Sequence, residues 1–306
     1  MKKKILILGG GISKERLISL ETAKSVFKEL KKKNYTVKIC EPDGNLIKNI
    51  KSFKPNIVFN ALHGQFGEDG YIQAILESQR VKYTHSGVLA SFIAMNKEFS
   101  KKIYIKNKIL TPKYIKFKFI NNKIEKNIIT KVQKKLKFPV VVKPINEGSS
   151  VNVYICTKKN FIQNLKKLTS YKEILIEKFI PGREIQVAIL GKRKLGAIEL
   201  KPKRKFYDYE AKYNEKAKTK HIIPVDLSKK NFKKVMNIAF KAHKLIGCRG
   251  VTRSDFKFYK GKFFLLETNT QPGMTKLSLV PEIANYKGMK FIDLIEWILK
   301  DASTNR

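Results

Sequence analysis

GVTRSDFKFYKGKFFLLETNTQPGMT, residues 250–275, is the stretch of this 306-residue sequence that decides most about its fold. Residues 250–259 and 262–268 have the composition of β-strands, and Gly261 stands between them at the position of a tight turn. The stretch therefore predicts an antiparallel hairpin whose turn is centred on Gly261. In that register one face of the hairpin is apolar and is expected to face the core. It carries Phe256, Phe264 and Leu266.

The other face of the predicted hairpin is polar. Asp255 lies opposite Glu267 and Arg253 lies opposite Asn269, and residues two apart on a strand share a face, so all four side chains project from one side. Two opposed carboxylates destabilise a hairpin unless a cation neutralises them. With the amide oxygen they form the oxygen-rich ligand set that Mg²⁺ prefers, and we interpret the face as a metal site. The alternative is a solvated face on which Arg253 alone pairs with the acids, and a one-residue slip of the register would separate the groups.

The N-terminal part of the sequence alternates between strand-like and helix-like segments. This pattern predicts a doubly wound parallel sheet that binds ligands at the carboxyl ends of its strands. The glycine turn at residues 9–11 does not match the dinucleotide fingerprint, because Lys14 occupies the third glycine position, and this excludes NAD. The apolar runs are residues 4–8, 35–40 and 56–62, and the helical pattern covers residues 17–30.

Beyond residue 95 the pattern changes, and Pro181-Gly182 marks a second joint. We therefore expect an α/β protein of three parts, residues 1–95, 96–181 and 182–306. The strands expected in the second and third parts, besides the hairpin, are residues 138–144, 151–156, 173–180, 184–190 and 195–200. The helices expected there are residues 160–168, 229–246 and 291–301.

Composition limits the class of protein. The 65 Lys and Arg against 25 Asp and Glu give a net charge of +40, yet 42% hydrophobic residues, with 19 Phe and 12 Tyr, exclude a disordered polyelectrolyte. The cations are spread along the chain, and residues 61–79 contain none, so we favour a lysine-rich solvated surface over a nucleic-acid-binding face, which remains the alternative. Three scattered cysteines and the lack of an export or membrane-spanning segment predict a soluble cytoplasmic protein.

Phosphate binding is indicated at a second place. No Walker A motif is present, but Lys143 ends a predicted strand just before the loop 146–150, whose backbone N–H groups and hydroxyls could surround phosphates. Residues 202–218 are charged and aromatic, which suits either a surface loop or a lid over a polyanion. Taken alone, His63 is best explained by local hydrogen bonding and Glu15 by a favourable place at a helix start.

Eight segments then follow one another in an informative order. They are GGGISKERLISL (9–20), ALHGQFGEDGYIQAILE (61–77), YTHSGVLASFIAMNK (83–97), VVVKPINEGSSVNV (140–153), ILIEKFIPGREIQVAILG (174–191), FYDYEAKY (206–213), GCRGVTRSDF (247–256) and LLETNTQPGMTKLSLVP (265–281). Together they closely resemble the D-alanine-D-alanine ligase family, over nearly the whole chain. The resemblance implies the ATP-grasp fold, in which two α+β subdomains that sandwich ATP follow an N-terminal doubly wound parallel-sheet domain.

The resemblance also implies an activity. ATP would phosphorylate the carboxylate of one D-alanine, and the amine of a second D-alanine would attack the acyl phosphate, giving D-alanyl-D-alanine for peptidoglycan synthesis. For the first D-alanine it implies that Glu15 binds the ammonium group, with Ser149 and Tyr213 hydrogen-bonded beside it and His63 nearby.

For ATP the resemblance implies contacts with several parts of the chain. Lys97 and Lys143 would bind phosphates and Lys212 the transferred γ-phosphate. Glu177 would bind the adenine amino group and Glu184 the ribose.

The resemblance places the remaining roles near the hairpin. It implies two Mg²⁺ ions, with Mn²⁺ as a substitute, held by Asp255, Glu267 and Asn269. It also implies that Arg253 and the backbone N–H of Gly273 stabilise the tetrahedral oxyanion. Ser278-Leu279 would receive the carboxylate of the second D-alanine.

Three positions depart from the family pattern. They are Asn96, usually Asp, Asn152, commonly Gly, and Gln271, commonly smaller, and we expect none of them to contact a residue with assigned chemistry. Another ATP-grasp ligase remains an alternative, but it would not need Glu15 or the segment FYDYEAKY in these forms. The family suggests a homodimer, with no nucleic-acid or membrane partner.

Overall fold

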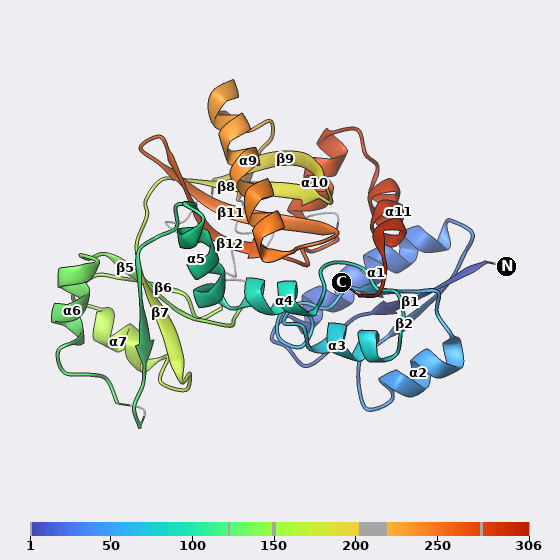
Figure 1. Ribbon diagram of the computed structural model, residues 1–306, viewed down its shortest axis with the longest axis horizontal. Coiled ribbons are helices and arrows are strands. Elements are labelled where there is room, and N and C mark those ends of the chain that lie inside the picture. The colour runs from blue at the N-terminus through green and yellow to red at the C-terminus, as the bar shows by residue number, and fades with distance from the viewer. Residues whose placement is uncertain (1, 122, 149–150, 202–218, 276–277, 306) are drawn as a thin grey trace.

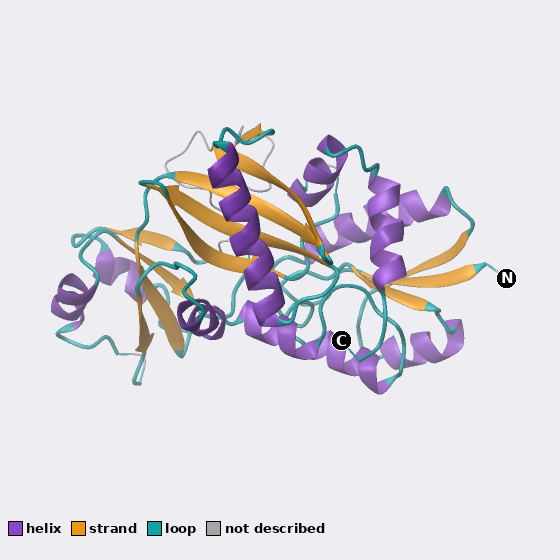
Figure 2. Cartoon of the chain, turned by 45° about the horizontal axis from the view of Figure 1, so that its top comes forward, coloured by secondary structure: helices purple, strands orange, loops and turns teal. Residues whose placement is uncertain are grey.

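The computed structural model describes residues 2–121, 123–148, 151–201, 219–275 and 278–305. It has three β-sheets, and in Figures 1 and 2 the C-terminal sheet lies between the central and the N-terminal sheets. Within the described residues, no helix is both long enough and apolar enough to cross a membrane.

The N-terminal sheet consists of three parallel strands in the order β2-β1-β3. Alternate residues of β1 point to opposite faces: Ile5 and Ile7 pack on the side of α1, and Leu6 and Leu8 pack on the side of α2 and α3. Helices therefore cover both faces, as the doubly wound pattern predicts. The elements are β1 (Lys3–Leu8), α1 (Arg16–Lys31), β2 (Tyr35–Cys40), α2 (Leu46–Phe53), β3 (Ile57–Asn60) and α3 (Tyr71–Ser78).

The central sheet has four antiparallel strands in the order β4-β7-β5-β6. Its apolar face packs on α6 and α7. Strand β6 begins at Tyr154, later than the expected start at residue 151, and Asn152 just before it has a left-handed backbone with φ 56°. The elements are β4 (Tyr114–Lys118), α6 (Ile128–Lys135), β5 (Val140–Pro144), β6 (Tyr154–Cys156), α7 (Phe161–Lys166) and β7 (Glu173–Lys178).

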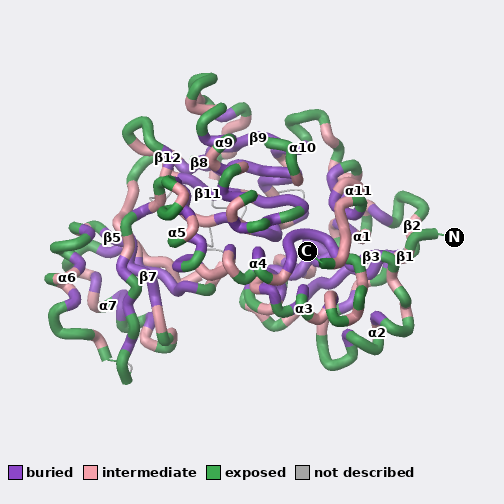
Figure 3. The backbone as a smooth tube through the Cα atoms, in the orientation of Figure 1, coloured by how far each residue is buried: buried purple, intermediate pink, exposed green. Residues whose placement is uncertain are grey.

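The C-terminal sheet has five antiparallel strands in the order β10-β9-β8-β11-β12, and α9 lies across one of its faces (Figure 2). Helices α10 and α11 pack in one apolar cluster with β8, β9, β1 and α1, so the C-terminal and N-terminal sheets share a core of buried residues (Figure 3). The elements are β8 (Arg183–Leu190), β9 (Arg193–Lys201), β10 (Lys220–Ile222), α9 (Lys229–Ile246), β11 (Val251–Tyr259), β12 (Lys262–Asn269), α10 (Leu279–Tyr286) and α11 (Phe291–Asp301).

The hairpin of β11 and β12 has the expected facing pairs for an unexpected reason. Its turn is Lys260-Gly261, both with positive φ, so Tyr259 pairs with Lys262 and Phe256 pairs with Leu265. With this turn alone, the pairs farther from the turn would be shifted by one residue along β12 relative to the prediction. A β-bulge at Asp255/Phe256 restores them, and Asp255 faces Glu267.

The apolar face of the hairpin differs from the predicted one. Phe256 is buried against α9 as expected, but Phe263 and Leu265 accompany it there. The predicted core residues Phe264 and Leu266 are only partly buried, because the two-residue turn places them on the other face.

Two short helices connect the N-terminal part to the central sheet, α4 (Val88–Met95) and α5 (Lys97–Lys106). The residue between them, Asn96, caps α5: its side-chain oxygen accepts the backbone N–H groups of Glu98 and Phe99 at 3.1 and 3.0 Å. An asparagine therefore serves as well as the aspartate usual in the family, and it fixes Lys97 as the first residue of the helix.

The contact between α9 and β11 contains a buried histidine. His243 is 4% exposed, and its Nδ1 lies 2.8 Å from Thr252 Oγ1. Burial lowers the pKa of His243 to about 4 from an ordinary value of 6.5, although the charge of Asp301 acts in the opposite direction.

This histidine makes stability depend on pH. Between the two pKa values the unfolded chain binds a proton that the folded chain does not, so stability falls as the pH drops through that window. We expect His243 to account for up to about 3 kcal/mol of that loss by pH 4. Urea unfolding at pH 7 and pH 4.5 should show a smaller loss for His243→Asn than for the unmutated protein. Equal losses in both proteins would contradict the assignment.

Candidate functional site

A cleft between the central and C-terminal sheets brings together most of the residues predicted to bind ATP and metal. Strands β5 and β7 supply Lys143 and Glu177 from one side, and β8, β11 and β12 supply side chains from the other. The lining residues are Lys97, Pro112, Val141, Lys143, Glu147, Val153, Glu177, Lys178, Phe179, Ile180, Glu184, Asp255, Lys257, Leu266 and Glu267. The bulged residue Leu266 thus contributes an apolar wall next to Glu267.

The polar face of the hairpin forms part of this cleft. Arg253 donates to both carboxylate oxygens of Asp255, at 2.8 Å from Nε and 3.0 Å from Nη2, and Nε also lies 3.0 Å from Gln186 Oε1. Asp255 is 4% exposed. The guanidinium group is therefore held in one orientation by two partners on adjacent strands.

Lys97 reaches the other carboxylate of the hairpin, Glu267, from helix α5. Its Nζ lies 3.5 Å from Glu267 Oε2 and donates to the backbone oxygen of Glu147 at 2.5 Å. The lysine therefore lies between the hairpin and the loop that follows Lys143, which is where a phosphate group bound by both would lie.

Lys143 belongs to a buried group of three charges. Its Nζ is 2.9 Å from Glu177 Oε2, and Lys101 Nζ is 2.9 Å from Glu177 Oε1. Burial raises the pKa of Glu177, but the two lysines outweigh burial and hold the pKa of this carboxyl below its usual range. Burial also lowers the pKa of Lys101 to about 8, in spite of the charge of Glu177.

A fourth cation, Lys257, pairs with another acid of the cleft. Lys257 Nζ lies 2.9 Å from Glu184 Oε2, and Gln186 Nε2 lies 3.3 Å from Glu184 Oε1. The acids of the cleft are thus paired with nearby cations. An anion that binds there would replace a carboxylate on one of the cations, and a metal ion would replace a cation on one of the carboxylates.

Glu15 lies at the start of α1, where loops from two parts of the chain meet. A Cβ on Gly64 or on Gly148 would lie 2.7 Å from Glu15 Oε2, so both loops approach the carboxylate closely because they carry glycine. Lys14, the preceding residue, forms an ion pair with Glu147 at 3.3 Å. The loop after β5 therefore reaches the end of the N-terminal sheet.

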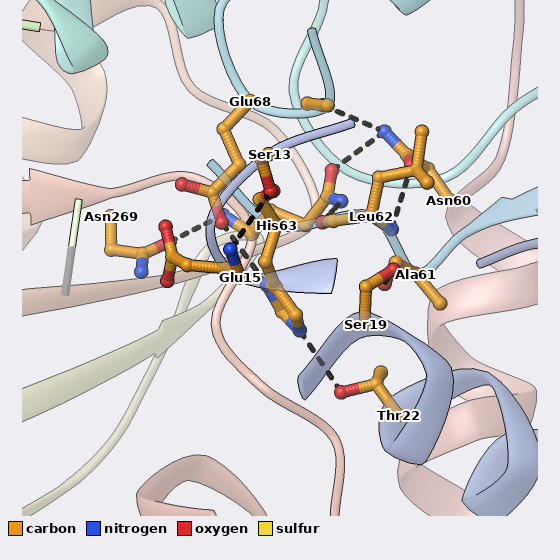
Figure 4. A network of polar contacts seen from close by, with 12 residues as sticks. Ser13, Glu15, Ser19, Thr22, Asn60, Ala61, Leu62, His63, Glu68 and Asn269 are labelled. Carbon is orange, nitrogen blue, oxygen red and sulfur yellow. Dashed lines mark hydrogen bonds and ion pairs between the residues drawn. The ribbon is translucent and has the colours of Figure 1, made fainter. Parts of the chain in front are cut away.

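His63 follows β3 and takes part in a network of polar contacts next to Glu15 (Figure 4). Its Nε2 lies 2.9 Å from Thr22 Oγ1 and its Nδ1 lies 3.1 Å from Glu68 Oε1. Ser13 Oγ donates to the backbone oxygen of His63 at 2.6 Å and accepts the backbone N–H of Glu15 at 3.2 Å. Burial raises the pKa of Glu68, His63 opposes that effect, and the charge of Glu15 adds to it.

The end of the hairpin leads to the residues assigned to the second substrate. Ser278 precedes helix α10, and a Cβ on Gly273 would lie 2.9 Å from its hydroxyl oxygen, so only glycine allows this approach. The hydroxyl lies 2.9 Å from Thr275 Oγ1 and accepts the backbone N–H of Thr275 at 3.0 Å. Ser149, Lys212 and Tyr213 lie outside the described residues, and their roles stay predictions.

The chain is similar to known proteins over its whole length. A family model described as "D-ala D-ala ligase C-terminus" matches residues 105–300. The chain is similar to the D-alanine--D-alanine ligase of Pelagibacter ubique (strain HTCC1062), with 74% identity over 100% of both chains. The chain belongs to the D-alanine-D-alanine ligase family. A ligase of this name from Wolbachia pipientis wMel is 42% identical, over 97% of this chain and 94% of that protein.

Solved structures of the family have the same fold. A D-alanine--D-alanine ligase from Bacillus anthracis complexed with ATP has a TM-score of 0.84 and 30% identity, and covers 98% of this chain and 97% of its own. A second structure of the Bacillus anthracis ligase has a TM-score of 0.86 at 32% identity, covering the same shares of the two chains. The expected ATP-grasp fold is confirmed.

Three side chains of the hairpin form a donor set that fits a divalent cation. Asp255 and Glu267 are direct cross-strand partners with Asn269 two residues further along β12. Asn269 adds an amide oxygen to these two carboxylates, and among the described residues no three His, Cys, Asp or Glu side chains form a metal cluster. This hard oxygen set suits Mg²⁺, whose other positions water or phosphate oxygens would fill.

One of the three departures from the family pattern contacts a residue to which a role is assigned. Gln271 touches a residue with assigned chemistry, because its backbone N–H donates to Asn269 Oδ1 at 2.7 Å. The expectation that no departure does so is wrong, since Gln271 lies only two residues beyond Asn269 and the chain turns back there. Asn152 in its left-handed conformation and Asn96 as a cap replace Gly and Asp by residues with matching backbone preferences.

Sequence reasoning missed several polar residues of the ligase site. Lys101 is one turn beyond Lys97 on α5, and this spacing on one helix face was a usable signal. Glu68 follows His63 within the segment 61–79, and the lack of cations in this segment is its sequence signal. Lys257 and Gln186 gave no sequence signal, because their partners lie on neighbouring strands.

The buried lysine leads to a prediction about ATP binding. Lys101→Met removes one of the two cations on Glu177 and leaves Lys143 as the partner of both Glu177 and the phosphates. A hydrogen bond to a charged group contributes about 1.5–3 kcal/mol, so we expect the KM for ATP to rise about tenfold or more. D-alanine kinetics at saturating ATP should change much less.

The neighbouring Lys102 provides the matched control. Its side chain is 59% exposed and pairs with Glu98 at 2.7 Å, outside the cleft. Lys102→Met should leave the KM for ATP unchanged. Equal effects of the two substitutions would contradict a specific role for Lys101.

Proposed function

We propose that the chain joins two D-alanine molecules to D-alanyl-D-alanine and converts ATP to ADP and phosphate. The full-length similarity to D-alanine--D-alanine ligases supports this activity. The observation that carries it in the structure is the cleft, where Lys97 and Lys143 face the cross-strand pair Asp255 and Glu267. This combination of cations and oxygen ligands suits a nucleotide with a divalent cation.

The first step transfers a phosphoryl group. The carboxylate oxygen of the first D-alanine attacks the γ-phosphorus of ATP, the bond to the β-phosphate oxygen breaks, and ADP leaves. Glu15 holds the ammonium group of this D-alanine, with His63 beside it. Ser149, Tyr213 and Lys212 complete the contacts to this substrate and the γ-phosphate.

The second step forms the peptide bond. The amine of the second D-alanine attacks the acyl-phosphate carbon, a tetrahedral oxyanion forms, and the carbon–oxygen bond to phosphate breaks as a proton leaves the nitrogen. Arg253 and the backbone N–H of Gly273 stabilise the oxyanion, because donors held in place interact strongly with charge that develops in the transition state. Ser278 and Leu279, at the positive end of α10, bind the carboxylate of the acceptor.

The charges of the cleft suit an exchange of partners. Lys97 and Lys143 pair with Glu267 and Glu177 in this structure, and phosphate oxygens would replace these carboxylates. Glu177 is then available to the adenine amino group, and Glu184 to the ribose hydroxyls.

Two Mg²⁺ ions, or Mn²⁺ in their place, would be held by Asp255, Glu267 and Asn269. When bound they supply positive charge to the phosphate oxygens. In their presence Arg253, which pairs with Asp255 in this structure, is available to the oxyanion.

Assay of the purified protein tests the proposal. ATP, Mg²⁺ and D-alanine should yield D-alanyl-D-alanine by mass spectrometry, with one ADP and one phosphate for each dipeptide. L-alanine should yield no dipeptide, and ATP without an amino acid should be consumed slowly. ATP consumption that does not depend on D-alanine would point to another ATP-grasp ligase and contradict the proposal.

The state of the enzyme in the cell is a further part of the proposal. We infer a cytoplasmic homodimer, and a group of exposed apolar side chains supports a contact between two copies. Leu89 is 73% exposed and Phe92 is 48% exposed on α4, and the ring of Phe92 lies 5.7 Å from that of Phe99. Light scattering should give twice the mass of the chain, 35.3 kDa, and Leu89→Glu should shift it toward the monomer.

A further inference from the structure

Gln271 lies in the turn that follows β12, between the hairpin and helix α10. It is 2% exposed, so its amide group is removed from water and needs partners. The three proposed metal ligands precede it in the chain, and Gly273 and Ser278 follow it. The proposed function gives Gln271 itself no role.

All the polar atoms of Gln271 that could position it have partners. Its backbone N–H donates to Asn269 Oδ1 at 2.7 Å, which fixes the orientation of the Asn269 amide. Its side-chain Oε1 accepts from Asn60 Nδ2 at 2.7 Å, and its Nε2 donates to the backbone oxygen of Leu62. One residue therefore connects the end of β12 with the end of β3, which lies 211 residues earlier in the chain.

The partners of Gln271 are themselves fixed. Asn60 is fully buried, its Nδ2 also donates to the Gly67 backbone oxygen at 3.0 Å, and its Oδ1 accepts the backbone N–H of Leu62 at 3.2 Å. His63 follows Leu62 directly, and its ring is bound by residues on two other segments, as Figure 4 shows for Thr22 and Glu68. A shift of Gln271 would therefore move the segment that carries His63 relative to Asn269.

We propose that Gln271 is a positioning residue that fixes the site of the first D-alanine relative to the phosphate and metal site. The inference rests on the proposed function. Phosphoryl transfer requires the attacking carboxylate to lie in line with the γ-phosphorus, and the two reactants are bound by parts of the chain that are far apart in sequence. A displacement of about 1 Å between reacting groups can lower the rate by as much as about 10²-fold.

The substitution Gln271→Met tests this role. Methionine fills a similar volume and keeps the backbone N–H that binds Asn269, but it loses both bonds to the N-terminal part. We expect kcat to fall at least about tenfold, with the KM for ATP within about twofold of the unmutated value. We also expect less than one dipeptide for each ADP, because a misaligned carboxylate allows water to take the phosphoryl group.

Gln73 offers a matched control in the same network. It is 1% exposed and donates to the Gly67 backbone oxygen at 2.9 Å, but it makes no contact with the hairpin in the described hydrogen bonds. Gln73→Met should lower the melting temperature as Gln271→Met does, and it should keep kcat and the dipeptide yield per ADP. A purely structural role for Gln271 predicts the same kinetics for both variants.

The outcomes separate this inference from the proposed function. If the unmutated protein makes no dipeptide, the proposed function fails. If it does, and Gln271→Met keeps kcat and full coupling, the positioning role is wrong. If Gln271→Met does not fold, Gln271→Asn, which keeps the amide but shortens the side chain, should show the loss of coupling. Failure of both variants to fold, with Gln73→Met folded, would contradict a positioning role.

Discussion

Arg253→Ala is expected to lower kcat by about 10²–10³-fold, the typical effect of removing one preorganised donor to an oxyanion. Asp255 and Gln186 hold the guanidinium group on the cleft face of β11, at 2.8–3.0 Å from their oxygens. When a metal ion binds Asp255, Gln186 would still accept from Arg253 Nε, so the guanidinium group needs little reorganisation when negative charge develops on the substrate. Steady-state kinetics with D-alanine and ATP varied separately should place most of the effect on kcat and little on the KM for ATP.

Arg183 provides a matched control for this substitution. It forms the same kind of bidentate pair, with Glu199 at 2.8 and 2.5 Å, but neither residue lines the cleft. Arg183→Ala should reduce stability while kcat for the folded protein stays near the unmutated value. A loss confined to ATP affinity in Arg253→Ala would contradict the oxyanion role.

Glu267→Gln is expected to abolish most of the Mg²⁺-dependent turnover. The change is nearly isosteric, but it removes one of the two anionic ligands that face each other across the hairpin. Loss of an outer-shell partner of a metal typically weakens metal affinity about 10–100-fold, so loss of a direct ligand should weaken it at least that much. Titration of turnover with Mg²⁺, and direct Mn²⁺ binding by electron paramagnetic resonance, measure the effect.

The fold of Glu267→Gln should survive, because the hairpin keeps its backbone pairing and its apolar face. Glu173→Gln is a suitable control, since Glu173 on β7 pairs with Lys116 at 2.7 Å and does not line the cleft. Turnover equal to that of the unmutated enzyme at ordinary Mg²⁺ in Glu267→Gln would rule out the metal assignment.

Much of the fold follows from local patterns in the sequence. The strand at residues 35–40 and the helices at 229–246 and 291–301 have the bounds that periodicity predicts. Local sequence is enough to predict these elements because the spacing of their apolar residues indicates which face is buried. Helix α5 and strand β4 were not predicted, because short, lysine-rich segments carry a weak periodic signal.

The candidate site was predictable in its residue types and only partly in its geometry. The facing of Asp255 and Glu267 was predicted, but it results from a two-residue turn and a compensating bulge, neither of which the pairing arithmetic contained. The two-residue turn also placed Leu266 on the wall of the cleft and not in the expected core. A bulge depends on the packing of both strands against α9 and β8, so no residue of the hairpin specifies it alone.

The sequence by itself determined most of the strands, the long helices, the acidic hairpin and the family to which its motifs belong. Only the tertiary structure decided which charges neutralise one another, as with Lys101 on Glu177, and which distant segments are joined, as with Gln271 on Asn60. The reason is physical: periodicity records which way a side chain points, whereas a buried polar group is stable only beside a partner that the folded chain brings to it.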